Sequence, residues 1–476
     1  MKFNLYLILA LIAANIGFAQ TRVEAGPSFN FDYKAELDAQ FVLKDNYNYY
    51  MLTVVNANGM MANRRMILRK FDQKNQLVDT YNYEFPKFDA STLYDYLGST
   101  ETNNGKVIVY TKSYSGKAKK SEIVAHSFDK ATAKFTSTVL DSAPIASLGK
   151  SGNVWMDKSD NGNYIGIVYT KNRAKNEAEK SLVLVLDNNS QNVAWKKDIE
   201  FTNDHVTDGM TVTNSGKVAV LRDNASFKKA NNFNYISLVS ADGQEDKNFE
   251  TGIFLHKMKA VSIGTQDYIF AFNATSRGMR QENFTHLLFY DLKEGKTLQN
   301  IRTQEMSSIK DLADVIIRAT PVQNNEIQIF AEPKVEIVTK PQPGMTTSAM
   351  FDKQYTYGPA YLYNIGFDGT LKGTKKLTSL STKAETSQSY GLLNVKGTYY
   401  ISTGFQTSQY STVYNGLFSL NGSNGFEPVK KQTLDADAYR YTYQLIHYLA
   451  DSSKLVAARV EGEDKMAMVT FTDIKL

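Results

Sequence analysis

The chain of 476 residues contains no cysteine. This absence excludes disulfide bonds, thiolate ligands for zinc, cysteine nucleophiles and a lipid-modified cysteine, so packing and hydrogen bonds must hold the fold together. Proline is also scarce, with 9 residues. After the N-terminal region, no segment has the roughly 18 uninterrupted apolar residues that a membrane helix needs. The sequence therefore predicts a mature chain without a transmembrane segment.

The first 19 residues have the layout of an export signal. Lys2 provides a positive start, residues 5–16 form a mostly apolar core, and Gly17-Phe18-Ala19 places small residues at a cleavage site. We therefore expect a signal peptide over residues 1–19. The mature chain is expected to be exported, either to the periplasm or outside the cell.

Aromatic residues, in contrast, are abundant, and short turns recur between strand-like stretches. The 29 tyrosines and 26 phenylalanines favour strands over helices. Many of these stretches end at Asp or Asn, at spacings of 49–58 residues apart from one of 77. We interpret these residues as turn formers, because their side chains can accept a hydrogen bond from the backbone two residues on. They are Asp72, Asp129, Asp187, Asp242, Asp291, Asp368, Asn421 and Asp473.

The third repeat displays the whole unit. Strands are expected over residues 153–159, 164–171, 181–187 and 192–201, which are rich in β-branched and aromatic residues. Four consecutive antiparallel strands make a small sheet that cannot bury both faces alone, whereas a ring of such sheets buries each against its neighbours. The sequence thus predicts an all-β fold, a β-propeller of four-stranded antiparallel blades that forms a single domain over residues 20–476.

The number of turns predicts the number of blades. Eight turns indicate eight blades, and seven blades with one divergent unit are the alternative. The last repeat has only three expected strands, so the ring needs a fourth strand from elsewhere. Residues 29–33, which precede the first blade, can supply it and close the ring, pairing edges that would otherwise be exposed.

The turn Ser159-Asp160-Asn161-Gly162-Asn163-Tyr164-Ile165 has a recognisable pattern. It resembles the S-x-D-G-x-Y-hydrophobic blade turn of secreted propellers of the TolB and prolyl-oligopeptidase type, with Asn161 in place of the usual Asp. The turns at Asn104-Gly105 and Ser215-Gly216 match more loosely. The resemblance implies a propeller fold and no particular activity.

Known catalytic motifs are missing from the sequence. It has no G-x-S-x-G elbow, no H-E-x-x-H helix, no phosphate-binding P-loop and no EF-hand calcium loop. For His126 and His286, which lie within or beside expected third strands, we favour packed or surface histidines over metal ligands. We predict no metal site and no cofactor, and no catalytic residue can be named. The remaining histidines, equally scattered, are His205, His256 and His447.

Basic side chains gather in the connections between second and third strands. Connections in a meander alternate between its two ends, so all of these connections are expected on one face of the ring. Four are expected to be long, over residues 112–121, 171–180, 222–234 and 273–284, with thirteen basic and four acidic side chains between them. Such a concentration of charge attracts anionic partners, although loops also favour lysine for solubility alone. The candidate contacts are Lys117, Lys119, Lys120, Arg173, Lys175, Lys228, Lys229, Arg277 and Arg280.

The spacing of 77 residues marks an insertion in the sixth repeat. Its second-to-third connection is expected to run from about Ala331 to Pro359 and to fold over the central opening as a lid. Tyr355 and Tyr357 suit stacking against a sugar ring, and they equally suit anchoring the connection on its own blade.

These features favour a non-catalytic binding or scaffold propeller. Its basic face is expected to bind an anionic or carbohydrate-like partner, such as an acidic polysaccharide, a glycolipid or an envelope protein. Nucleic acid is not expected as a partner of an exported chain. Two alternatives are a glycan-active hydrolase or lyase with its site at the central channel, and a structural module that docks to another protein of the cell envelope.

Overall fold

The structure is a computed structural model. It describes residues 22–32, 36–42, 48–55, 64–171, 177–201, 205–224, 234–249, 253–274, 286–309, 312–317, 322–323, 326–337, 354–357, 361–376, 382–383, 390–395, 398–406, 413–421, 425–428, 440–449, 454–462 and 464–472. The expected signal peptide lies outside these residues.

Strands make up almost all of the regular structure in the described residues, and the first sixteen after β1 form four sheets of four strands each. The first sheet contains β2 (Glu36–Val42), β3 (Asn48–Val55), β4 (Arg65–Asp72) and β5 (Leu77–Glu84). The second contains β6 (Leu93–Glu101), β7 (Lys106–Ser115), β8 (Lys120–Asp129) and β9 (Lys134–Pro144). The third contains β10 (Asn153–Lys158), β11 (Tyr164–Thr170), β12 (Lys180–Asp187) and β13 (Val193–Glu200). The fourth contains β14 (His205–Val212), β15 (Val218–Asn224), β16 (Tyr235–Val239) and β17 (Gln244–Asn248).

The remaining strands form four further sheets, and two short helices connect neighbouring sheets. The fifth sheet contains β18 (Phe254–Ile263), β19 (Gln266–Ala274), β20 (His286–Asp291) and β21 (Lys296–Arg302). The sixth contains β22 (Leu312–Ile317), β23 (Val322–Gln323), β24 (Glu326–Ile337), β25 (Gln354–Tyr357), β26 (Tyr361–Gly366), β27 (Leu371–Lys376) and β28 (Thr382–Lys383). The seventh contains β29 (Tyr390–Val395), β30 (Thr398–Gln406), β31 (Val413–Asn421) and β32 (Gly425–Pro428). The eighth contains β33 (Arg440–Leu449), β34 (Lys454–Gly462), β35 (Lys465–Thr472) and β1 (Arg22–Asn30), and the helices are η1 (Leu148–Lys150) and α2 (Gln304–Ser307).

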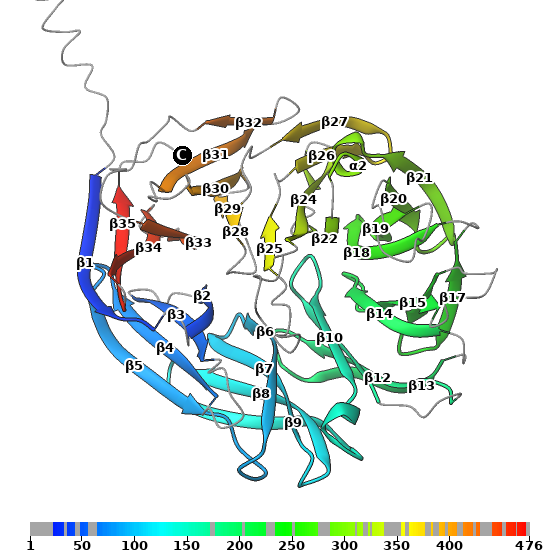
Figure 1. Ribbon diagram of the computed structural model, residues 1–476, viewed down its shortest axis with the longest axis horizontal. Coiled ribbons are helices and arrows are strands. Elements are labelled where there is room, and N and C mark those ends of the chain that lie inside the picture. The colour runs from blue at the N-terminus through cyan, green and yellow to red at the C-terminus, as the bar shows by residue number, and fades with distance from the viewer. Residues whose placement is uncertain are drawn as a thin grey trace, which may run out of the picture.

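The sheets follow one another around a ring (Figure 1). In the first five sheets and the seventh, the first strand lies nearest the centre and the last strand lies at the rim, whereas in the eighth sheet β33 is innermost and β1 lies at the rim. Neighbouring first strands contact each other, as β10 does with β14 and β14 with β18. This arrangement of radial antiparallel sheets is a β-propeller, as the sequence predicted.

The third repeat confirms the predicted unit. Its four strands begin and end within one residue of the expected bounds, and each pairs antiparallel with the next. The N-terminal strand differs more from its expected position. It is β1, over Arg22–Asn30 rather than residues 29–33, and it pairs antiparallel with β35. The N-terminal strand β1 therefore lies at the rim, beside β35, the last described strand (Figure 1).

The insertion in the sixth repeat is partly strand, contrary to the expectation of a connection from about Ala331 to Pro359. Strand β24 continues to Ile337, and β25 pairs with its extension. The short strand β28 pairs in turn with β25. The backbone hydrogen bonds of this extra ladder hold both ends of the insertion, whose residues 338–353 lie outside the described part.

The middle strands are buried on both faces, so each of them packs against both neighbouring sheets. In β7, Val107 and Val109 pack in a cluster with the first sheet, whereas Ile108 and Tyr110 pack in a cluster with the third sheet. Successive side chains of a strand point to opposite faces, so one strand serves both clusters. The rim strand β5, in contrast, is mostly exposed.

Five of the eight recurring residues form turns through their carboxylates, as predicted, and Asp473 lies outside the described residues. The Asp72 carboxylate accepts hydrogen bonds from the backbone N–H groups of Lys74 at 2.8 Å and Gln76 at 2.9 Å. The Asp187 carboxylate accepts one from the Ser190 N–H at 2.7 Å, and this bond together with the Ser190 hydroxyl lowers its pKa. Equivalent backbone bonds reach Asp129, Asp291 and Asp368.

The turn at Ser159 shows why its residue types recur. Asn161 Oδ1 accepts hydrogen bonds from the Ser159 hydroxyl at 2.9 Å and the Asn163 N–H at 3.0 Å, and Gly162 adopts a φ of +74°. The turns at Gly105 and Gly216 share the positive φ and begin with a threonine, Thr102 or Thr213, whose hydroxyl accepts a backbone N–H in the same way.

Asn75 joins the first sheet to the eighth. Its side-chain oxygen accepts hydrogen bonds from the hydroxyls of Tyr49 and Thr470, both at 2.8 Å, and its side-chain nitrogen donates to the Glu24 carbonyl at 3.0 Å. Asn75 is 1% exposed and has a φ of +62°. The backbone of β1 passes so close that a Cβ on Gly26 would lie 2.1 Å from the Asn75 carbonyl oxygen. One buried side chain thus ties β1 and β35 to the first blade.

Asn161→Asp is expected to stabilise the protein, by about 1 kcal/mol, because hydrogen bonds to a carboxylate are stronger than those to an amide. Both recorded bonds of the Asn161 side chain are accepted by Oδ1, so a carboxylate keeps both. Urea denaturation of the variant measures the change, with the neighbouring exposed Asn163→Asp as the control. A lower midpoint for Asn161→Asp than for the control contradicts this account of the turn.

Asn75→Ala is expected to destabilise the protein by roughly 2–4 kcal/mol. The substitution leaves buried hydrogen-bonding groups without their partner, at about 1–3 kcal/mol each, and places a Cβ-bearing residue of poor left-handed propensity at positive φ. Asn75→Gly removes the hydrogen bonds alone and separates the two effects. Urea denaturation at neutral pH measures both variants, and an unchanged midpoint for both shows that Asn75 does not secure the terminal sheet.

Candidate functional site

The described part of the expected basic face lies at the turn between β7 and β8. This turn consists of only residues 116–119, and it presents the exposed Lys117 and Lys119. Lys120 begins β8, where its ammonium pairs with Glu122 at 2.5 Å. Gly116 packs against Leu148 of η1, where a Cβ on the glycine would lie 3.1 Å from Leu148 Cγ. The exposed Lys150, in the same short helix, therefore adds to the charge beside the turn.

Three of the four connections begin later than predicted, because their expected first residues, Lys112, Arg222 and Asn273, belong to strands. Lys112 lies within β7 and Arg222 within β15, and both side chains are buried. The guanidinium of Arg222 pairs with Glu179 and lies 3.7 Å from the centre of the Phe201 ring. These charges are compensated inside the protein, so they do not contribute to an exposed basic surface.

For several candidate residues, the side chain or the whole residue lies outside the described part of the structure. Tyr355 and Tyr357 belong to β25, opposite Glu336 and Lys334 in the ladder. The remaining candidates lie outside the described residues. They are Arg173, Lys175, Lys228, Lys229, Arg277 and Arg280.

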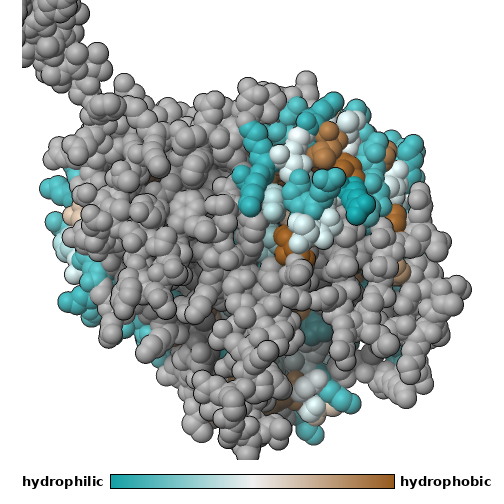
Figure 2. Space-filling view, turned by 45° about the horizontal axis from the view of Figure 1, so that its top comes forward, coloured by the Kyte–Doolittle hydropathy of each residue, from teal (hydrophilic) through white to brown (hydrophobic). Residues whose placement is uncertain are grey.

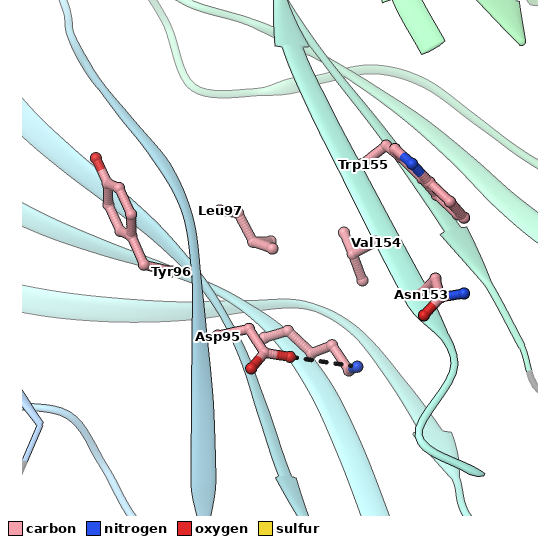
Figure 3. A pocket seen from close by; sticks show the side chains of 7 residues that line it. Asp95, Tyr96, Leu97, Asn153, Val154 and Trp155 are labelled. Atoms are coloured by element: carbon pink, nitrogen blue, oxygen red, sulfur yellow. Dashed lines mark ion pairs between the residues drawn. The ribbon is translucent and has the colours of Figure 1, made fainter. Parts of the chain in front are cut away.

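A cavity of about 320 Å³ lies between the second and third sheets, at the inner strands β6 and β10. It belongs to the same face as the β7–β8 turn, since the lining residues of β6 pair with the end of β7 that enters this turn. In Figure 3, Leu97 and Val154 point toward each other across the space, whereas Tyr96 and Trp155 point away from it. The full lining consists of Asp95, Tyr96, Leu97, Lys112, Asn153, Val154 and Trp155.

An ion pair forms the polar end of the cavity (Figure 3). Lys112 Nζ lies 3.5 Å from Asp95 Oδ2, and it donates closer hydrogen bonds to the Ser151 hydroxyl at 3.0 Å and the Gly152 carbonyl at 2.7 Å. Burial lowers the pKa of Lys112, and the nearby Asp95 carboxylate opposes this change. Lys112 is only 4% exposed, whereas the Asp95 side chain is 48% exposed.

Sequence reasoning missed this cavity. Lys112 was assigned to a loop, and no sequence pattern marked Asp95 as a site residue. The two residues come from neighbouring strands of one blade, and Ser151 and Val154 come from the next blade. No motif of consecutive residues can reveal such a site, because it forms only where two sheets meet.

The histidine prediction is confirmed for His126, which is a packed residue. His126 lies in β8 and is fully buried, with its ring stacked on Phe85 at 4.4 Å between centres. Its two nitrogens are 2.9 Å from the Thr111 hydroxyl and 2.8 Å from the Ser137 hydroxyl. Burial lowers the pKa of His126 to about 4, so the ring is neutral at ordinary pH.

Metal and membrane features were sought in the described residues. No three His, Asp or Glu side chains in this part of the chain lie close enough to hold a metal ion. The same residues contain no helix with the length and apolar character needed to cross a membrane.

The fold places the chain in the class of β-propeller proteins. No protein-family model and no curated protein matches the sequence. Similar solved structures include the β-propeller domain of the Trilobed protease from Pyrococcus furiosus, with 12% identity over 86% of this chain and 98% of that one and a TM-score of 0.40. They also include the Dos1 propeller (11% identity, 94% and 95% covered, TM-score 0.44) and the polysaccharide lyase Uly1 (10% identity, 94% and 99% covered, TM-score 0.37). At these identities the similarities carry no conclusion about activity.

Protein stability is expected to fall with pH between about 6.5 and 4 because of His126. An unfolded histidine titrates near pH 6.5, whereas the folded pKa of His126 is about 4. The unfolded chain therefore binds the extra proton first as the pH falls, which costs folding about 3 kcal/mol across this window. The contribution is fully present above pH 6.5.

His126→Gln removes this titration and keeps hydrogen-bonding groups for Thr111 and Ser137. Urea denaturation at pH 7 and pH 4 should show that the wild type loses about 3 kcal/mol more than the variant. Titration of the carboxylates is common to both proteins and cancels in the comparison. Equal losses in the two proteins contradict a buried neutral His126.

Proposed function

We propose that this chain is a non-catalytic binding propeller for an acidic polysaccharide, which it contacts through the face that carries the β7–β8 turn. The observation that carries the proposal is the pair of exposed lysines, Lys117 and Lys119, on a short turn that follows β7, the strand that also supplies Lys112 to the cavity. The turn and the cavity are held by strands rather than by a long loop, so their positions relative to each other are fixed.

The charges around the turn support an anionic partner. Lys117, Lys119 and Lys150 are exposed on neighbouring segments. Two acids lie nearby. Glu122 pairs with Lys120, and the Asp89 carboxylate, held by hydrogen bonds from Ser115 and Ser91, also interacts with Lys117, so the basic side chains still outnumber the acids. A local excess of positive charge raises the concentration and encounter rate of a polyanion.

The cavity does not support glycoside hydrolysis. Glycosidases that act through two carboxyl groups hold them roughly 5–9.5 Å apart, whereas Asp95 is the only carboxyl among the residues that line this cavity. The ammonium beside it is buried and hydrogen-bonded to neutral backbone and hydroxyl groups. The arrangement suits recognition of a ligand better than proton transfer to it.

The alternative of a docking module finds less support in the described surface. Hydrophobic atoms in the coloured part of Figure 2 lie in small groups among hydrophilic ones. Large apolar patches are what mark docking surfaces. The exposed large hydrophobic side chains among the described residues come from four segments, and only Leu77 and Val78 are consecutive. The others are Val139, Leu148 and Val193.

Export is part of the proposal. It rests on the charged, apolar and small-residue regions of residues 1–19, which are typical of a secretory signal. A polysaccharide of the cell surface or its surroundings is a partner that an exported chain would meet.

Reversing the charge of the turn is expected to weaken binding of an acidic polysaccharide at least tenfold at low salt. The double variant Lys117→Glu/Lys119→Glu replaces attraction with repulsion, and exposed charges interact less as salt rises. Isothermal titration of polyuronate and of a neutral glucan, at low and moderate salt, measures the effect.

The matched control is Lys74→Glu/Lys293→Glu. These exposed lysines lie in the β4–β5 and β20–β21 turns, at the opposite face of the ring, and their replacement changes the net charge by the same amount. The proposal predicts nearly unchanged binding in this control. Equal losses in both double variants, or no binding of polyuronate by the wild type, overturn it.

A further inference from the structure

The cavity between β6 and β10 has a polar end and an apolar side. Asp95 and Lys112 form the polar end, and Leu97 and Val154 form the apolar side (Figure 3). A ligand that fills the cavity must match a charged pair and an apolar surface at once.

Lys112 has no capacity left for a ligand. An ammonium has three hydrogen-bond donors, and those of Lys112 are directed to the Ser151 hydroxyl, the Gly152 carbonyl and the Asp95 carboxylate. The residue is also almost completely buried. An anionic ligand would have to displace one of these acceptors in order to reach the ammonium.

Asp95, in contrast, retains capacity to accept hydrogen bonds. A carboxylate has about four lone-pair positions, and Asp95 accepts one hydrogen bond from the Tyr114 hydroxyl at 3.3 Å and a long contact from Lys112 at 3.5 Å. These two neighbours lie on β7 and hold the carboxylate from behind, while about half of the side chain is exposed. The accessible polar group of the cavity is therefore the Asp95 carboxylate, which is held in place and can accept further hydrogen bonds.

The charges of Asp95 and Lys112 determine which kind of hydrogen-bond donor can bind to the Asp95 carboxylate. An anion would face the exposed carboxylate first and be repelled. A second cation would compete with Lys112, which already supplies the compensating charge. An uncharged hydroxyl group donates a hydrogen bond to the carboxylate without disturbing the pair.

We propose that this cavity binds one uncharged, hydroxyl-bearing sugar ring, with Asp95 accepting hydrogen bonds from its hydroxyls and with Leu97 and Val154 packing against the ring from opposite walls. This inference rests on the proposed function in taking the partner to be a saccharide. In this arrangement Lys117 and Lys119 contact the acidic groups of the polymer, and the cavity holds a neutral ring. Lys112 is a positioning residue, because it acts through Asp95.

The size of the cavity fits this ligand. Its volume of about 320 Å³ is at the lower end of the range for small-molecule sites. One ring fills such a space, whereas a longer segment of polymer must extend out of it.

The test compares charged forms of the same ring. Glucose, galactose and mannose are titrated alongside their uronic acids and their protonated amino sugars, with saturation-transfer NMR and isothermal titration on the full chain. We expect at least one neutral hexose to bind and its charged forms to bind at least fivefold more weakly. Absence of binding by all three neutral hexoses, or tighter binding of a uronic acid than of its parent hexose, overturns the inference.

Asp95→Ala is expected to lower the affinity for the neutral hexose at least tenfold. The position is half exposed, so the variant should fold, and Asp95→Asn, which keeps one acceptor oxygen, is expected to retain partial affinity. Lys112→Met tests the positioning role. It should weaken hexose binding and raise the relative affinity for the protonated amino sugar, because Asp95 then lacks its compensating cation. Undiminished hexose binding by both Asp95 variants contradicts the assigned contact.

The two proposals fail in different experiments. Lys117→Glu/Lys119→Glu should leave hexose binding unchanged, and Asp95→Ala should leave the salt dependence of polyuronate binding unchanged. Loss of hexose binding in the lysine variant shows that the ring binds at the turn and not in the cavity. Polyuronate binding without any hexose binding leaves the proposed function intact and refutes the cavity as a subsite.

Discussion

The need to cover both faces of every sheet is the constraint on which the rest of this structure depends. In β7, alternate residues pack in two different clusters, with Val107 toward one neighbouring sheet and Ile108 toward the other. A sheet of this kind has no stable surface of its own and must lie between two others. The ring follows from this requirement, and it leaves only the connections, the inner strands and the rim for interactions with other molecules.

Much of the fold could be predicted because its signals are local. The strands of the third repeat are visible as β-branched runs, and Asp72 and Asp187 mark turns because each carboxylate binds backbone groups within a few residues. The position of β1 was harder to predict from the sequence. Its position depends on Gly26 and Asn75, which meet only when the first and last repeats come together.

Little of the candidate site could be predicted, because charge in a sequence does not reveal burial. Lys112 and Arg222 were counted as exposed, yet both lie in strands and are compensated by partners from other segments. A charged side chain can be buried when an opposite charge and hydrogen bonds compensate it, as they do for Lys112 and Arg222. Lys117 and Lys119 are exposed as expected, so the basic face is smaller at this blade than the sequence suggested, and it lies beside a cavity that the sequence could not show.

Hydrogen–deuterium exchange of the full chain, with and without polyuronate, tests most directly where the partner binds. The account predicts protection of segments 116–120 and 148–150, which form the basic turn and the neighbouring η1. Protection confined to the opposite-face turns at residues 72–76, 187–191 and 291–295 would contradict the proposal that this face is the binding surface.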